Sequence, residues 1–168
     1  MNEQVHIRGI DLGYITITAE DEEVEINTNA ITNPFIVTDA TGEYPVWAVA
    51  DGGVMPIIDV LFVMTEASGV SRHGLMVADG GRAIVRPEKG VKNAQGTGIY
   101  VFNSGSASCF GADFSFAKSQ GARVFRGSYL NIREGNLSNA GTNGMYMGSS
   151  SIVEAMRVDL SNAGGRAL

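Results

Sequence analysis

The tetrapeptide Ser-Asn-Ala-Gly occurs twice, at Ser138–Gly141 and again, 23 residues further along, at Ser161–Gly164. The same interval, with no gap, separates four alanines: Ala94, Ala117, Ala140 and Ala163. A fixed period between roughly 20 and 50 residues indicates a stacked repeat, in which each unit buries its apolar face against its neighbours. The period therefore decides the fold class.

Apolar residues recur in fixed columns when the chain is written in rows of 23 residues from Ala48. We expect four columns to point inward: the sixth (Gly53, Met76, Ile99, Ala122, Met145, Leu168), the eighth (Met55, Ala78, Val101, Val124, Met147), the fourteenth (Leu61, Ile84, Ala107, Leu130, Val153) and the twenty-first (Val91, Phe114, Leu137, Leu160). Columns six and eight face one side of a strand because they lie two positions apart. This spacing predicts about three short strands per row.

Short strands at this period exclude the helical repeats, and the Leu-x-x-Leu-x-Leu pattern of leucine-rich repeats is absent. The prediction is an all-β protein: a right-handed parallel β-helix of about five 23-residue coils over residues 48–168. Successive coils would stack at the inter-strand distance of about 4.8 Å.

Residues 1–47 alternate apolar and polar side chains but do not keep the 23-residue register. We expect a small β-rich cap or attachment region here, with the acidic run Glu20–Glu23 in a solvated turn. Two departures occur within the repeat itself. Arg86 stands in an inward column, so we expect Arg86–Gly90 to bulge outward, and the sixth row stops at Leu168, where a partner chain or a longer protein would cover the open end.

Composition excludes several classes of protein. A net charge of −6 and a pI of about 4.8 argue against nucleic-acid binding, which needs a basic face. The longest apolar run, Val54–Met64, is too short for a membrane helix, so no membrane insertion is expected. The single Cys109 excludes an intrachain disulfide, and the histidines give no metal-ligand spacing, so no metal or cofactor is predicted. Cys109 itself should be a buried thiol.

Coils of about 23 residues rich in Gly, Ser and Asn, carrying apolar ladders after a short β-rich N-terminal part, resemble the β-helical tailspikes and tail fibres of bacteriophages. Pectate-lyase-like enzymes and bacterial adhesins share such coils. The resemblance implies a homotrimer in the phage tail, outside the host cell after synthesis in the host cytoplasm. It also implies attachment to other virion tail proteins through residues 1–47 and binding of host surface polysaccharide. The chain is shorter than the usual family member.

Three acidic residues are candidates for polysaccharide cleavage, which requires two carboxylates flanking the glycosidic bond. Asp113 and Asp159 share an outward column two rows apart, and Glu134 lies in the row between them. Two rows correspond to about 10 Å. Outward acids are equally typical of any solvated face, and that interpretation stays open beside the catalytic one.

Large side chains in the outward columns form a second candidate site: Tyr100, Phe102, Arg123, Phe125 and Tyr146. An exposed aromatic patch indicates a binding surface. These residues would either stack on sugar rings or bury themselves against neighbouring subunits, and the phenylalanines, which lack a polar group, favour the subunit interface.

The leading functional hypothesis is a structural, receptor-binding component of a phage tail without catalysis of its own. A polysaccharide depolymerase, either a glycosidase or a lyase, is the first alternative. A bacterial β-helical adhesin is the second.

Overall fold

Nearly all regular structure in this protein is β strand, and strands far apart in the sequence pair in parallel. The structure is a computed structural model and describes residues 4–37, 40–66, 71–148 and 150–166. Within these ranges the only helical segment is a single 3-10 turn, η1 (Thr28–Ala30). None of the described segments forms a helix that is long and apolar enough to cross a membrane.

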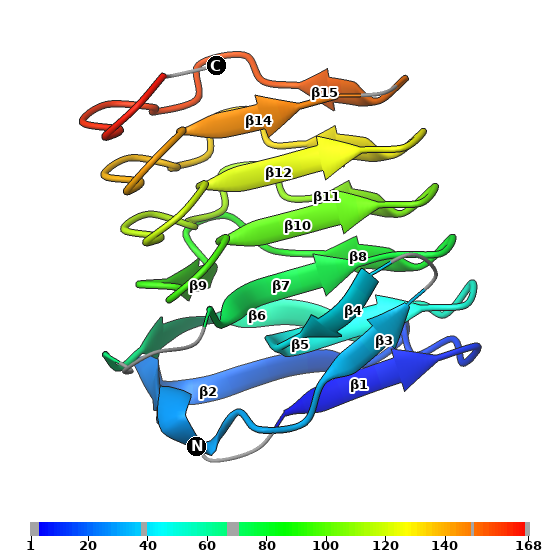
Figure 1. The fold of residues 1–168 in the computed structure, drawn as a ribbon. Helices are drawn as coiled ribbons and strands as arrows, with labels where there is room; N and C mark the ends of the chain where they lie inside the picture. The colour runs from blue at the N-terminus through cyan, green and yellow to red at the C-terminus, as the bar shows by residue number, and fades with distance from the viewer. Residues whose placement is uncertain (1–3, 38–39, 67–70, 149, 167–168) are drawn as a thin grey trace.

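The largest sheet has six parallel strands in the order in which the chain reaches them, and we call it the front sheet (Figure 1). Its strands are β1 (Val5–Arg8), β5 (Pro45–Ala50), β7 (His73–Val77), β10 (Ile99–Phe102), β12 (Ala122–Phe125) and β14 (Met145–Met147). Each strand pairs only with the one before and the one after it, so the rows predicted from the sequence lie one above another.

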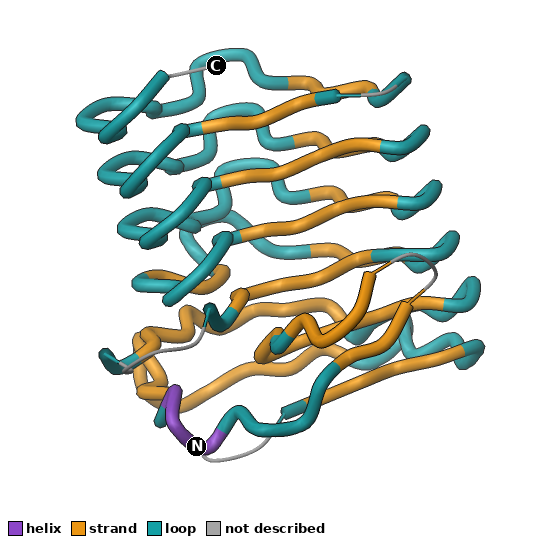
Figure 2. The backbone as a smooth tube through the Cα atoms, viewed as in Figure 1, coloured by secondary structure: helices purple, strands orange, loops and turns teal. Residues whose placement is uncertain are grey.

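Two further parallel sheets complete each row. The back sheet contains β8 (Arg82–Ile84), β11 (Ser106–Ser108), β13 (Tyr129–Asn131) and β15 (Ile152–Glu154). The side sheet contains β2 (Thr16–Ile26), β6 (Ile57–Met64) and β9 (Gly90–Lys92), and single bridges extend it through Asp113, Asn136 and Asp159. The turns between the sheets also lie above one another (Figure 2).

The core lies between these sheets and is made of the inward columns. The prediction is confirmed from Val91 onward for residues that are buried in one core cluster: Val91, Ile99, Val101, Ala107, Phe114, Ala122, Val124, Leu130, Leu137 and Met145. Cys109 is completely buried in the same cluster, as predicted. Leu168 lies outside the described residues.

The column assignment was wrong by one residue in the row before Ala94. Ile99 pairs with Leu75, where Met76 was expected, and Val101 pairs with Val77, where Ala78 was expected. Met76 and Ala78 therefore pack in a second cluster on the outer face of the front sheet. In the back sheet Ala107 pairs with Ala83, which leaves the expected inward residue Ile84 41% exposed.

Arg86 causes this shift because it is one extra residue in the turn between the back and side sheets. Val85 is buried at the level of Cys109, 24 residues later, whereas Glu88 and Gly111 occupy equivalent turn positions only 23 residues apart. Both Glu88 and Gly111 have a positive φ, of 63° and 67°. Arg86 is exposed, as expected, but the segment is an ordinary turn lengthened by one residue, not a bulging loop.

The parallel stacking begins at β1, so the boundary expected at Ala48 does not separate two structural units. β1 pairs in parallel with β5, and β2 pairs with β6. The acidic run expected in a turn lies inside β2, whose register to β6 shifts between Thr18 and Glu23. Exposed carboxylates along an edge strand discourage further strands from pairing there.

A hairpin formed by β3 (Phe35–Val37) and β4 (Ala40–Glu43) departs from the rows and lies across the outer face of the front sheet (Figure 1). Phe35 is buried there in the second cluster with Met76 and Phe102. The outer face of the front sheet is therefore covered by the chain itself in its first rows and open in its last rows.

Candidate functional site

The outer face of the front sheet carries all five residues of the predicted aromatic site, because alternate residues of a strand face the same side. Tyr100, Arg123 and Tyr146 stand at the same level of β10, β12 and β14, and Phe102 stands opposite Phe125. The adjacency predicted from the 23-residue spacing is therefore confirmed.

These side chains form one connected cluster around the guanidinium group of Arg123. Its Cζ lies 5.0 Å from the ring centre of Tyr100, 4.9 Å from that of Phe125 and 5.9 Å from that of Tyr146. The rings of Tyr100 and Phe102 stack at 4.6 Å, and those of Tyr100 and Phe125 lie 5.5 Å apart. Cation–π contacts of this kind hold a guanidinium group in a fixed orientation.

Only part of the cluster reaches solvent. Tyr100 is 4% exposed and Phe102 is completely buried, whereas Tyr146 is 46% exposed. A shallow cavity of about 260 Å³ lies over the accessible part, which we call the front-face site: Arg123, Phe125, Arg126, Tyr146 and Gly148. Sequence reasoning missed Arg126, which follows directly after a predicted site residue and faces the same cavity.

The front-face site is positively charged in a chain of net charge −6. The Nε atom of Arg123 is buried and has no hydrogen-bond partner among the described residues. The Arg123 charge opposes the raised pKa of Tyr100, which burial produces. Guanidinium groups suit carboxylate, sulfate and hydroxyl oxygens, so the site can bind polar, hydroxyl-rich or acidic ligands.

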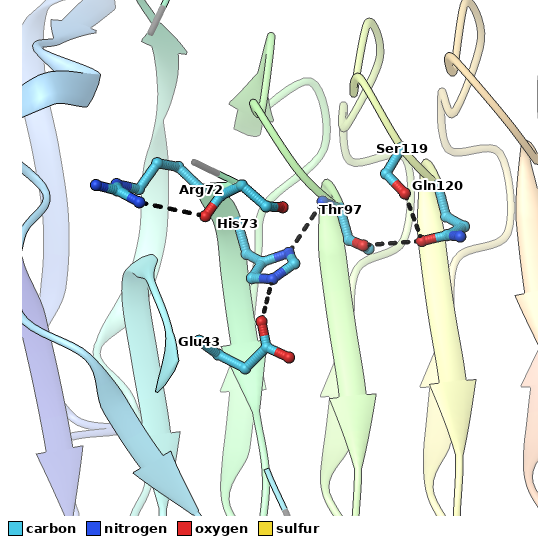
Figure 3. A network of polar contacts seen from close by, with 7 residues as sticks. Glu43, Arg72, His73, Thr97, Ser119 and Gln120 are labelled. Atoms are coloured by element: carbon cyan, nitrogen blue, oxygen red, sulfur yellow. Dashed lines mark hydrogen bonds and ion pairs between the residues drawn. The ribbon is translucent and has the colours of Figure 1, made fainter. Parts of the chain in front are cut away.

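A buried polar network anchors the hairpin just beside this site (Figure 3). The backbone N–H of Thr97 donates to His73 Nδ1 at 3.0 Å, so Nε2 carries the ring proton and donates to Glu43 Oε2 at 2.5 Å. This hydrogen bond is the main reason why the pKa of Glu43 is lowered. The His73 ring meets Tyr100 edge-on at 5.8 Å. The network therefore fixes β4 over the aromatic cluster.

The network continues along the next rows at the same position in each row. Thr97 Oγ1 donates to Gln120 Oε1 at 3.1 Å, and Ser119 Oγ donates to the same oxygen at 2.9 Å. Sequence reasoning assigned His73 no partner, since Glu43 belongs to the hairpin and is 30 residues away in sequence. Both ring nitrogens are already engaged, so His73 positions the hairpin and has no nitrogen left for proton transfer.

The acidic column forms as predicted, and its side chains serve the turns. Asp113, Asn136 and Asp159 are joined by parallel bridges. Each side-chain oxygen accepts a hydrogen bond from the backbone N–H two residues later, at 2.9, 3.0 and 2.9 Å. This is the Asx-turn geometry that Asp and Asn share. Hydrogen bonds from Ser161 lower the pKa of Asp159, which makes it unsuited to the role of general acid.

The other candidate acids have separate surroundings. Glu134 lies in a turn with a φ of 59° and forms an ion pair with Arg157. Asp113 lines a cavity of about 370 Å³ together with Glu23, Glu88 and Lys89. The carboxylates that the structure gathers around Asp113 therefore come from the side sheet and its turn, and the sequence columns did not predict them.

Among the described residues, no three His, Cys, Asp or Glu side chains are grouped so that they could hold a metal ion. Burial raises the pKa of the Cys109 thiol far above its usual value, which leaves that group protonated and unreactive. Comparison with known proteins adds no relative: no family model, no curated protein and no solved structure matches this chain.

Proposed function

We propose that this chain is a right-handed parallel β-helix and a structural, receptor-binding component of a phage tail that binds host surface polysaccharide. The strand order supports the β-helix, because successive rows add one strand each to the front sheet and, from β8 on, to the back sheet. The observation that carries the binding function is the front-face site, where Arg123, Phe125 and Tyr146 share one cavity on a rigid sheet.

Binding would combine apolar and polar contacts on a surface that is already ordered. The rings of Phe125 and Tyr146 offer faces for the C–H groups of a sugar, and Arg123 and Arg126 offer donors for its hydroxyl or carboxylate oxygens. The Arg123 guanidinium group is oriented by three rings before a ligand arrives. Little side-chain entropy is then lost on binding.

In this proposal the working unit is a homotrimer on the virion, outside the host cell, and it contacts other tail proteins. The same surface could instead be buried between subunits, as the sequence favoured. The exposed half of Tyr146 and the polar lining of the cavity support the polysaccharide contact.

A binding assay on purified protein tests the proposal. Capsular and O-antigen polysaccharides are titrated by isothermal calorimetry, and native mass spectrometry gives the oligomeric state. We expect Tyr146→Ala to weaken binding about tenfold, as loss of one stacking ring does, while the trimer persists. Tyr14→Ala is the matched control, since Tyr14 is 81% exposed in the first row.

Two results would count against the proposal. A monomeric protein that binds none of the polysaccharides removes both the trimer and the receptor. A Tyr146→Ala protein that dissociates yet still binds polysaccharide assigns the surface to a subunit interface.

The carboxylates beside Asp113 favour the alternative, a polysaccharide depolymerase. Asp113, Glu23 and Glu88 share one cavity, and glycosidic cleavage needs two carboxylates. Glu134 and Asp159 complete the set of candidate acids. Release of reducing ends from polysaccharide by the wild type, lost in Asp113→Asn, would establish this activity.

A further inference from the structure

A cavity of about 540 Å³ lies at the corner of the molecule where the strands of the side sheet end. Its lining includes one aromatic side chain and five polar ones: Phe116, Asn93, Gln95, Glu25, Glu66 and Lys118. This volume is within the range of small-molecule sites. None of these six residues belongs to the front-face site.

Phe116 has a backbone conformation that a bulky residue rarely adopts. Its φ is 58°, and the residues at the equivalent corner of other rows, Asn93, Asn139 and Asn162, have φ values of 57°, 57° and 56°. Asn tolerates this left-handed conformation, whereas a Phe residue there is an outlier. Every row imposes the conformation, and only this row places a phenyl ring on it.

The strain at Phe116 is not offset by burial, because the residue is 49% exposed. Phe116 also interrupts a ladder of amides: Asn162 Nδ2 donates to Asn139 Oδ1 at 3.3 Å one row further on. The backbone of Phe116 still joins the stack, since its N–H donates to Ser138 O at 2.9 Å. The phenyl ring therefore costs local stability, and an observed outlier of this kind points to function.

We infer that Phe116 is the stacking platform of a second carbohydrate site, which takes a neutral hexose unit. A pyranose presents apolar C–H groups on its faces and hydroxyl groups at its edges. The ring of Phe116 suits the face, and the amides of Asn93 and Gln95 suit the hydroxyl groups. Two carboxylates, Glu25 and Glu66, against one ammonium group, Lys118, disfavour phosphate or an acidic sugar.

The choice of a carbohydrate rests on the proposed function, whereas the location rests on the cavity and on the strained ring. The two sites differ in charge, since the front-face site carries two arginines. We therefore expect this corner to bind neutral sugar units and the front face to accept acidic ones.

The variant Phe116→Asn separates binding from stability. Asn suits the backbone angle and adds an amide between Asn93 and Asn139, so we expect the melting temperature to rise by about 2–4 °C. Binding of neutral glucose, galactose, mannose and rhamnose oligosaccharides, measured by saturation-transfer NMR and calorimetry, should weaken about tenfold. Phe110→Asn is the control, because Phe110 is 40% exposed at another corner.

Each other outcome overturns the inference. A lower melting temperature for Phe116→Asn removes the strain argument, and unchanged affinity removes the platform. A changed oligomeric state assigns Phe116 to a protein interface. Wild-type protein that binds no polysaccharide defeats the proposed function as well, whereas binding that is lost in Tyr146→Ala and kept in Phe116→Asn defeats this inference alone.

Discussion

The His73 ring shows how a single buried residue can hold a segment that leaves the repeat. Its Nδ1 accepts from the Thr97 backbone, and its Nε2 donates to Glu43 on the hairpin. A charge-assisted hydrogen bond of this type contributes about 1.5–3 kcal/mol. The hairpin is thus anchored through one carboxylate.

We predict that Glu43→Gln lowers the free energy of unfolding by about 1–3 kcal/mol at pH 7. The pKa of Glu43 is lowered in the folded protein, so its contribution is present above the ordinary value of 4.5 and is lost as the pH falls further. The difference between variant and wild type should therefore shrink toward pH 3. Denaturant titrations at both pH values measure it.

Glu88→Gln is the control for this prediction, since Glu88 is an exposed carboxylate in a turn. It should leave stability nearly unchanged at both pH values. A Glu43→Gln protein that is equally destabilised at pH 3 and pH 7 would show that packing, not charge, sustains the contact.

Cys109 allows a second residue-scale prediction. The thiol is completely buried and its pKa is raised by burial, so the reactive thiolate is suppressed. We expect no reaction with a thiol reagent at pH 8 in the folded protein and complete reaction in denaturant. Rapid labelling of the native protein would place Cys109 at the surface and contradict the inward column.

At the scale of single elements, the glycines that precede the front strands permit successive rows to approach. An added Cβ at Gly121 would lie 2.6 Å from the carbonyl oxygen of Gly144, and one at Gly98 would lie 2.6 Å from that of Gly121. Because both neighbours are backbone atoms, side-chain repacking cannot relieve the overlap. The column Gly98, Gly121, Gly144 thus fixes the row spacing at this corner.

Gly121→Ala should therefore destabilise the protein by about 1–3 kcal/mol, as overpacking does. Gly148→Ala is the matched control, because its added Cβ would meet nothing closer than 3.9 Å. Thermal unfolding of both variants measures the difference. Equal melting temperatures would mean that the rows can separate at Gly121 without cost.

The sequence predicted the strands best where the row length is constant. From Val91 onward, side chains in one column meet at one level of the stack, so spacing alone identifies the core. One extra residue, Arg86, reversed the assignments of Met76, Ala78 and Ile84, because a shift by one residue moves a strand's side chains to the opposite face. A break in periodicity can be noticed in a sequence, but its position in the turn cannot.

The candidate site was predictable in its composition and not in its accessibility. The columns brought Tyr100, Arg123 and Tyr146 together correctly. The burial of Tyr100 and Phe102 could not be predicted, since the packing of a non-repeating hairpin leaves no periodic signal. The acidic column likewise revealed its position but not its hydrogen bonds to the backbone.

For the whole molecule, stability depends on each row having neighbours on both sides. The described chain ends in a row whose apolar side chains are exposed, with Met147 at 55% and Ile152 at 63%. The equivalent residues Val101 and Val124 are completely buried. Local opening is easiest where buried contacts are fewest.

We therefore predict a gradient of amide hydrogen exchange along the stack. Amides of β14 and β15 should exchange at least about tenfold faster than those of β10 and β11, because only one adjoining row protects them. Exchange followed by NMR under native conditions measures both groups in one sample. Identical rates in all four strands would indicate that the rows open only together.

The turn lengthened by Arg86 also has a practical consequence. The sheets on both sides of this corner keep their pairing although the row is one residue longer, so chain length here is decoupled from strand register. Splicing of a foreign peptide between Arg86 and Glu88 would thus project an epitope from the stack while its scaffold stays intact. The corner is a natural graft point for display and vaccine design.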